Sequence, residues 1–228
     1  MKWSGTRLLK LLEKLRREIN TKAASNSNVK TIVSGVARAI GYDLRHLIRV
    51  IYQDECLRWI NELRPQSLDV LEISAGAAWR DIPFKSFTEM NYPDYDICKD
   101  KLDRQFDLVI ADQVFEHLLW PYRAGRNVFD MVKPGGYFMV MTPFMIRIHD
   151  VPVDCSRWTE TGMRYFLAEC VFELETIKTG AWGNRDSLKA NLVTWARVGW
   201  RKSFPNELAY PQSIWAMARK PLALGDGH

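Results

Sequence analysis

Cysteine is scarce in this sequence and occurs in no metal-binding pattern. The four cysteines, Cys56, Cys98, Cys155 and Cys170, are far apart, and no two of them form a CxxC pair. Structural zinc sites usually use such pairs, and disulfide frameworks need cysteines at a higher density. We therefore expect reduced thiols, no structural zinc, and a cytoplasmic protein.

Long apolar runs are also missing. No stretch approaches the roughly 20 apolar residues that a membrane-spanning helix needs. Residues 1–20 carry charges throughout, unlike the apolar core of a secretory signal. We expect no transmembrane segment. With 228 residues, 47% of them hydrophobic, the chain can form one α/β domain and a modest extension.

Acidic residues are few in the first part of the chain. Residues 1–64 contain 13 Lys/Arg and 6 Asp/Glu, a surplus of +7, whereas the remainder contains 19 and 21. An enzyme that acts on nucleic acid would more often carry its basic surface on the catalytic domain. A nucleic-acid substrate is therefore not expected.

A basic amphipathic helix is predicted at Leu8–Ile19, where apolar residues recur at spacings of three and four. It could pack on the core or on a second subunit of a homodimer. It could also close over the active site on a polar hinge at 21–28, or lie on an anionic membrane surface. A second helical stretch runs from Val29, is interrupted near Gly41, resumes through Leu44 and ends before Pro65.

From Leu68 onward, short apolar runs alternate with helical patterns, which indicates βαβ units and a mostly parallel sheet. We therefore expect a helical extension at residues 1–64 and a catalytic domain at 65–228, with an insertion at 182–204. Thr159 is placed to cap a helix. The predicted strands are 68–74, 86–90, 106–112, 136–142, 172–178 and 214–219, and the predicted helices are 122–132 and 159–168.

A turn of small residues follows the first predicted strand. Residues 68–78 read LDVLEISAGAA, so the strand ends with Glu72 near a turn in which only Gly76 is a glycine. Small side chains allow the backbone to approach a cofactor closely. The segment resembles the E/D-x-G-x-G motif of class I S-adenosylmethionine (SAM)-dependent methyltransferases, with Ser74 and Ala78 in place of glycines. The alternative is an ordinary buried strand and turn.

Two further segments resemble the same family, in its small-molecule type. Residues 106–118 read FDLVIADQVFEHL, and VKPGGYF follows at 132–138. Pro134 ends the helix, and Gly135 and Gly136 supply a turn before the next strand. The resemblance spans about residues 50–220. It implies an enzyme with a Rossmann-like fold, a mostly parallel seven-stranded sheet flanked by helices, and SAM as the cofactor, released as S-adenosylhomocysteine (SAH).

The resemblance also implies how SAM is held at the strand ends. Glu72 would serve the positive end of the cofactor, Glu89 or Asn91 would hold the ribose hydroxyls, and Asp96 would meet the adenine amino group. Each carboxylate could instead be a solvated loop residue. The predicted cofactor-binding residues are Glu72, Ser74, Ala75, Gly76, Glu89, Asn91, Asp96, Asp112 and Gln113.

Two histidines are candidates for general base. Methyl transfer to a hydroxyl requires removal of its proton, and an imidazole suits this at neutral pH. His149 is the first candidate and His117 the second. Either could instead be a structural or pocket-shaping residue. His149, Asp150 and Asp154 could alternatively hold a divalent metal, although aspartates are also common in turns.

The acceptor is expected to be an oxygen of a small molecule, sugar or glycan precursor. Residues 112–115 lack the Asp/Asn-Pro-Pro-aromatic motif of nucleic-acid amino-methyltransferases. A carboxylate or phosphonate acceptor, a SAM-binding scaffold without activity, and an aminopropyltransferase are the alternatives. Arg147 and Arg157 could bind an anionic acceptor group. The predicted aromatic wall of the acceptor pocket is Trp158, Tyr165 and Trp182.

Overall fold

The computed structural model describes residues 35, 39, 42–76, 78–199 and 204–222. The predicted helix at 8–19 and the hinge at 21–28 lie outside the described residues. The chain forms two compact units, residues 1–46 with 197–203, and residues 47–196 with 204–228. The predicted domain division at residue 65 stays a prediction.

In the described part of the first unit, a two-stranded antiparallel ladder joins β1 (Asp43–His46) to β7 (Arg197–Gly199). The prediction of helix at Leu44 is therefore wrong. Strand β1 pairs with β7, which lies about 150 residues further along the chain, so the local sequence pattern could not indicate this pairing. Helix α3 begins at Leu47 and ends at Glu62, in the second unit.

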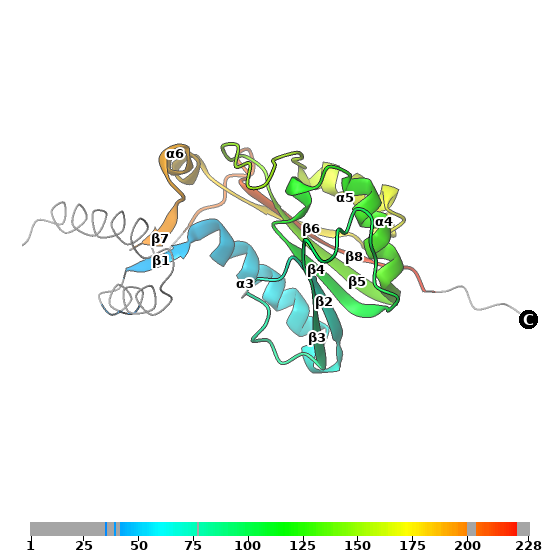
Figure 1. Ribbon diagram of the computed structural model, residues 1–228. Helices are drawn as coiled ribbons and strands as arrows, with labels where there is room; N and C mark the ends of the chain where they lie inside the picture. Colours follow the sequence, from blue (N-terminus) through cyan, green and yellow to red (C-terminus); the bar gives the residue numbers. More distant parts are fainter. Residues whose placement is uncertain (1–34, 36–38, 40–41, 77, 200–203, 223–228) are drawn as a thin grey trace, which may run out of the picture. The chain divides into compact units, whose positions relative to one another are not determined.

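A six-stranded sheet forms the centre of the second unit, with the strand order β3-β2-β4-β5-β8-β6 (Figure 1). Strands β2 to β5 are parallel, and β8 is antiparallel to both of its neighbours. This is the Rossmann-like α/β architecture that the sequence predicts. The strand bounds are β2 Asp69–Ile73, β3 Ser86–Met90, β4 Phe106–Asp112, β5 Val132–Pro143, β6 Lys178–Trp182 and β8 Ser213–Arg219.

The prediction of seven strands is wrong for this sheet, which has six in the described part of the chain. Among the described residues, no further strand lies beyond β3. Residues 91–105, which connect β3 to β4, form turns and irregular backbone. A parallel crossover alone needs about a dozen residues, so this connection has no room for an additional strand with its own crossover.

Helices cover both faces of the sheet. In Figure 1, α3 lies on one face, and α4 (Pro121–Met131) and α5 (Glu160–Glu169) lie on the other. The Thr159 side chain accepts a hydrogen bond from the Gly162 amide at 3.0 Å, so the predicted cap of α5 is confirmed. Within the described residues, no helix is both long and apolar enough to cross a bilayer.

The predicted strand at 172–178 is not formed. A short 3₁₀ helix, η3 (Leu174–Thr176), occupies the middle of that segment, and the strand β6 begins at Lys178. The side chains of Phe172 and Ile177 are buried and each packs separately into the hydrophobic core, which explains the apolar pattern without a strand. Gly180 permits the pairing of β6, because a Cβ there would lie 2.5 Å from the Trp215 ring.

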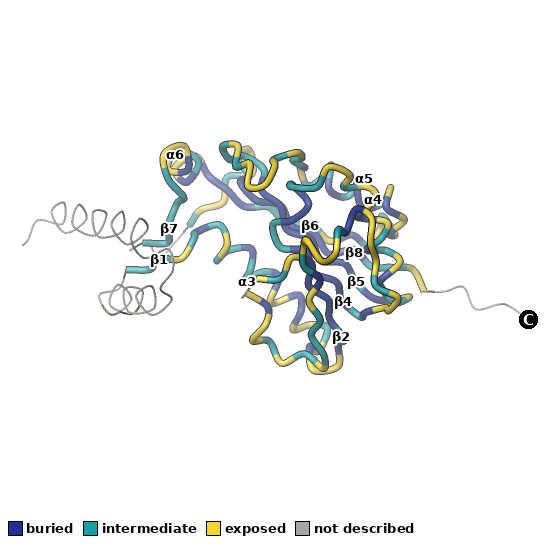
Figure 2. Tube along the Cα trace, viewed as in Figure 1, coloured by how far each residue is buried: buried dark blue, intermediate teal, exposed yellow. Residues whose placement is uncertain are grey.

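The insertion before the last strand contains one helix, α6 (Arg185–Val193), capped by the Asn184 side chain. Two short 3₁₀ helices, η1 (Pro65–Ser67) and η2 (Phe115–His117), precede β2 and follow β4. Burial is concentrated in the central strands, while the outward helix surfaces and the loops are exposed (Figure 2). The buried central strands thus support the carboxyl end of β4 and the helix η2 that follows it.

Candidate cofactor and active site

The two ends of the parallel strands differ in whether their polar side chains are hydrogen-bonded. At the amino ends, Asp69 and Asp107 both accept hydrogen bonds from the Lys133 ammonium, at 3.1 and 2.9 Å. At the carboxyl ends, several buried atoms have no hydrogen-bond partner among the described residues. These atoms are Glu72 Oε2, Gln113 Nε2, both carboxylate oxygens of Glu116, and Thr142 Oγ1. Unpartnered buried polar groups are costly, which indicates that the carboxyl edge is built for a ligand.

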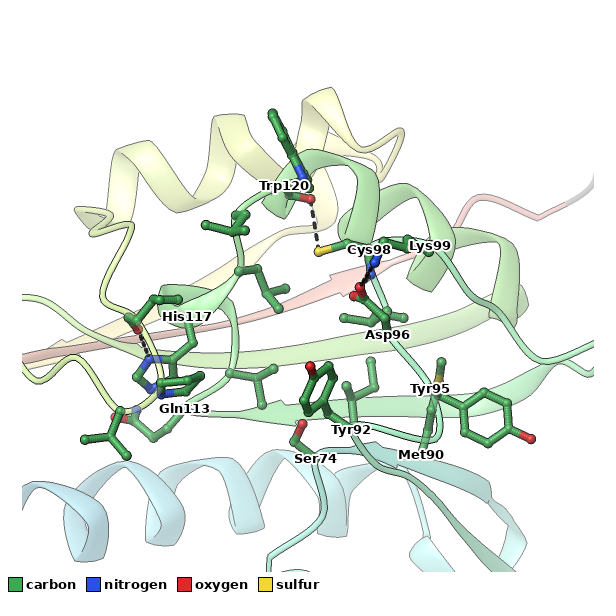
Figure 3. A pocket seen from close by; sticks show the side chains of 18 residues that line it. Ser74, Met90, Tyr92, Tyr95, Asp96, Cys98, Lys99, Gln113, His117 and Trp120 are labelled. Atoms are coloured by element: carbon green, nitrogen blue, oxygen red, sulfur yellow. Dashed lines mark hydrogen bonds and ion pairs between the residues drawn. The ribbon is translucent and has the colours of Figure 1, made fainter.

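A cavity of about 560 Å³ opens at this edge (Figure 3). It is lined by the ends of β2, β3 and β4 and by three loop segments, 95–99, 117–120 and 151–153. Its volume is typical of small-molecule sites. It also lies beside β2, where the strand order reverses, and this is where open α/β sheets bind their ligands.

The turn after β2 keeps a glycine-like backbone without the glycine. Ser74 has φ 55°, a left-handed conformation that usually requires glycine. Its amide donates to the Met90 carbonyl at 2.8 Å, and the Ala75 amide donates to Asn91 Oδ1 at 2.7 Å. The Gly76 amide donates to Glu72 Oε1 at 3.1 Å. Ser74 therefore adopts a backbone conformation that the glycine of the motif would also allow.

Glu72 is a buried carboxyl with unused binding capacity. Glu72 is 1% exposed, and its Oε2 atom has no hydrogen-bond partner within the described residues. Burial raises the pKa of Glu72, the hydrogen bond from the Gly76 amide lowers it, and the nearby charge of Asp112 raises it, so that the pKa is about 7. A cationic group of a ligand would favour the ionised form.

Asp112 and Gln113 have different surroundings although they are adjacent. Asp112 accepts hydrogen bonds from the Tyr52 hydroxyl at 2.7 Å and from Gln53 and Trp79 at 3.2 Å each. It thereby ties α3 and the segment after β2 to the end of β4. Gln113, with φ 60°, lines the cavity, and its amide nitrogen is one of the unpartnered buried atoms.

The predicted ribose and adenine residues occupy different environments. Glu89 is exposed and accepts two hydrogen bonds from Arg80, at 3.0 and 2.6 Å. Asp96 lines the cavity, forms an ion pair with Lys99 at 2.9 Å, and accepts a hydrogen bond from the Cys98 amide (Figure 3). The Lys99 hydrogen bond lowers the pKa of Asp96, so Asp96 is a carboxylate at neutral pH.

An aromatic side chain that the sequence analysis missed stands in the cavity. Tyr92 lies between Ser74 and Asp96 in Figure 3, and the residue is 75% exposed. A large exposed ring beside an apolar cavity can cover a planar base. A tyrosine directly after a candidate ribose residue, Asn91, is the signal that could have found it.

We expect Tyr92→Ala to weaken SAH binding by about threefold to tenfold, because an aromatic pair contributes roughly 0.5–1.5 kcal/mol. Calorimetric titration with SAH measures the change. Tyr165→Ala is the matched control, since Tyr165 lies exposed on α5 and does not line the cavity. Equal affinities of wild type and Tyr92→Ala would exclude contact between Tyr92 and the adenosine.

The two candidate histidines lie against each other. The ring centroids of His117 and His149 are 4.9 Å apart, with the rings nearly perpendicular. His117 Nδ1 is hydrogen-bonded to the Val153 carbonyl. A carbonyl only accepts, so Nδ1 carries the proton and Nε2 has the lone pair. Burial, followed by the nearby His117, lowers the pKa of His149, so its imidazole is neutral at neutral pH.

The loop after β5 is fixed above η2 by several hydrogen bonds. The amides of Cys155 and Ser156 donate to the Glu116 carbonyl at 2.8 and 3.2 Å. The His149 amide donates to Asp154 Oδ2 at 2.9 Å, and Arg157 forms a bidentate ion pair with Asp154. Burial would raise the pKa of Asp154, but the hydrogen bonds from Arg157 and His149 lower it. The loop thus holds His149 beside His117.

The predicted acceptor-binding residues do not line the cavity. The Arg147 guanidinium lies 4.3 Å from the Trp195 ring centroid and donates to the Asn191 carbonyl, while Arg157 pairs with Asp154. Trp158 and Trp182 are buried, and Tyr165 is exposed on α5. Asp150 is exposed.

Two further site features were missed by the sequence analysis. Val151–Val153 line the cavity, and this apolar run inside a polar loop was the available signal. Glu116 is a buried acid whose oxygens lie beside the histidine pair. The available signal was the Glu116–His117 pair flanked by the apolar residues Phe115 and Leu118.

Comparison with known proteins finds a match to a methyltransferase domain. Residues 67–140 match the family profile described as a methyltransferase domain. No curated protein matches the sequence. A SAM-dependent methyltransferase from Mesorhizobium loti is 15% identical over 72% of this chain and 96% of its own, with a TM-score of 0.46. One from Archaeoglobus fulgidus is 13% identical over 75% and 94%, with a TM-score of 0.49.

A third similar structure is phosphoethanolamine N-methyltransferase 2 from Haemonchus contortus in complex with SAM. It is 11% identical over 74% of this chain and 52% of its own, with a TM-score of 0.48. The match of residues 67–140 to a methyltransferase-domain profile, together with the Rossmann-like sheet and the turn after β2, indicates a SAM-dependent methyltransferase and is consistent with class I. SAM is accordingly the cofactor, and the buried unpartnered atoms Glu72 Oε2 and Gln113 Nε2 fit a polar ligand at this edge.

Proposed function

We propose that the enzyme methylates an oxygen of a small molecule, sugar or glycan precursor. The observation that carries the proposal is the pair of imidazoles, His117 and His149, at the cavity and its adjoining loop. SAM supplies the electrophilic methyl group. A hydroxyl acceptor must lose its proton as the bond to carbon forms, and a neutral imidazole can take it. His149 is the first candidate and His117 the second.

Several residues would hold the cofactor in this proposal. The Glu72 carboxylate receives its cationic amino group, and the backbone of Ser74–Gly76 approaches it closely. The Asp96 carboxylate accepts from the adenine amino group. Glu89 or Asn91 would hold the ribose; Glu89 accepts hydrogen bonds from Arg80, and Asn91 accepts one from the Ala75 amide. Each contact uses a group at the carboxyl edge of the sheet.

The surroundings favour a neutral hydroxyl over an anionic acceptor. Arg157 is satisfied by Asp154, and Arg147 is stacked on Trp195. Neither guanidinium is therefore placed to grip a carboxylate or phosphonate without rearrangement. The end of β4 also lacks the paired prolines that accompany methylation of amino groups on nucleic-acid bases.

Two measurements test the proposal in sequence. Calorimetric titration should show one equivalent of SAM or SAH bound and no binding of NAD. The loaded enzyme is then supplied with matched acceptors that carry a hydroxyl, an amino group or a carboxylate on the same sugar scaffold, and SAH release is measured. Methylation of the hydroxyl compounds alone supports the proposal. Methylation confined to the amino or carboxylate compounds would overturn it and leave SAM dependence intact.

A further inference from the structure

Glu116, His117 and His149 form a cluster that the proposed proton transfer does not fully use. Each offers one ligand atom, and these atoms all lie within 4.8 Å of one another. Glu116 and His117 belong to η2, while His149 comes from the loop after β5. Two imidazoles and one carboxylate form a donor set typical of divalent transition-metal ions.

The Glu116 carboxyl group is buried without a hydrogen-bond partner among the described residues. The residue is 0% exposed, and neither oxygen has such a partner in the described part of the chain. His117 Nε2 lies 3.6 Å from Oε1, too far for a hydrogen bond, and the guanidinium of Arg157 is paired with Asp154. A buried carboxylate is ordinarily paired or bound to a metal. A cation between Glu116 and the two histidines would supply this partner.

The orientation of His117 is that of a metal ligand. Its Nδ1–H donates to the Val153 carbonyl, which fixes the tautomer and leaves the Nε2 lone pair available. Nε2 lies 3.6 Å from Glu116 Oε1. Histidines that bind metals almost always donate their other ring N–H to a carbonyl or carboxylate. This hydrogen bond is independent of the carboxylate argument and supports the same site.

The supporting loop is also fixed. The Cys155 and Ser156 amides bind the Glu116 carbonyl, and the His149 amide binds Asp154. The three ligands are thus held by hydrogen bonds outside the cluster. The metal ligands considered from the sequence were His149, Asp150 and Asp154. Of these, Asp150 is exposed and Asp154 forms an ion pair with Arg157, so only His149 belongs to the cluster.

We propose that Glu116, His117 and His149 bind one divalent transition-metal ion at the wall of the cavity. Metal–ligand bonds of about 2.0–2.2 Å put ligand atoms about 3–4 Å apart, so small side-chain rotations close the cluster. Three protein ligands leave a coordination position for an oxygen. The role of the ion rests on the proposed function: the ion would bind the acceptor hydroxyl and lower its pKa, so that water takes the hydroxyl proton before the oxygen attacks the methyl group of SAM and SAH leaves. With the ion bound, the nitrogen lone pairs of the two histidines are used as ligands, and the ion replaces an imidazole as the group that activates the hydroxyl.

The test measures metal binding without SAM or an acceptor. The full chain, without a histidine tag and stripped by a chelator, is titrated with Co²⁺ and followed by visible absorption, with Zn²⁺ as competitor. We expect one equivalent to bind. Glu116→Gln and His149→Ala should each weaken binding by at least about tenfold, since both remove a direct ligand. His46→Ala and Asp150→Asn, which lie outside the cluster, should not.

Folding and SAH affinity are measured for each variant, so that loss of a ligand is separated from loss of structure. Absence of saturable Co²⁺ binding by the folded wild type would overturn the metal site, as would equal binding by folded Glu116→Gln. Because the titration requires no methyl transfer, its failure leaves O-methylation standing. Conversely, a metal-binding enzyme that methylates only nitrogen would overturn the proposed function and not the site.

Discussion

Replacement of His149 by alanine is expected to slow methyl transfer by at least about 100-fold, which is the usual loss of rate when one proton-transfer group is removed. The affinity for SAH is expected to stay within about twofold of the wild-type value, because a proton-transfer group acts on the acceptor. His149 lies against His117 and outside the residues that line the cavity. Its removal therefore takes away the group that activates the acceptor, while the contacts to the cofactor remain. The reduction is expected whether His149 takes the proton directly or binds an ion that lowers the pKa of the hydroxyl.

Single-turnover rates with a hydroxyl acceptor, together with calorimetric SAH affinities, measure this effect. Ile148→Ala is the matched control because Ile148 is the preceding residue and is 78% exposed. We expect the control to retain nearly the wild-type rate. A His149→Ala enzyme with full turnover and unchanged SAH affinity would remove His149 from the mechanism.

Glu72→Gln is expected to stabilise the ligand-free protein at pH 8 by about 2 kcal/mol and to weaken SAM binding by about tenfold or more. The carboxyl is buried, and its pKa in the folded protein is about 7 against an ordinary value of 4.5. Ionising it in the folded state therefore costs free energy that glutamine avoids. The same substitution removes the charge that would bind the cationic end of SAM.

The pH dependence follows from the direction of this shift. Below the ordinary pKa of 4.5, Glu72 is protonated in both states and causes no penalty. Between 4.5 and 7 only the unfolded state has released the proton, so the penalty grows as the pH rises and is complete above 7. The stability gap between Glu72→Gln and the wild type should be small at pH 4.5 and largest at pH 8.

Urea unfolding at these two pH values measures the gap, and titration with SAH and SAM measures the affinity. Glu89→Gln is the control, because Glu89 is exposed and its ion pair with Arg80 should contribute only about 0–1 kcal/mol. A Glu72→Gln protein no more stable than the wild type at pH 8 would show that Glu72 is not a destabilising carboxylate.

Short-range features of the fold were predictable because their causes are local. The strands at 86–90 and 106–112 have the predicted bounds, and the Thr159 cap forms as expected. Runs of apolar residues, turn-forming glycines and a capping hydroxyl act through neighbouring backbone. The prediction of a strand at 172–178 was wrong because the buried residues Phe172 and Ile177 produce the same apolar pattern as a strand.

The sequence by itself determined the α/β class, the methyltransferase resemblance and the segments that end at the cofactor edge. These depend on hydrophobic periodicity and on short motifs, and both are written in consecutive residues. Tertiary structure decided that His117 and His149 touch, and that Glu116 is buried beside them without a hydrogen-bond partner in the described chain. Periodicity shows which residues are buried, but only packing between distant segments determines which side chains they are buried against.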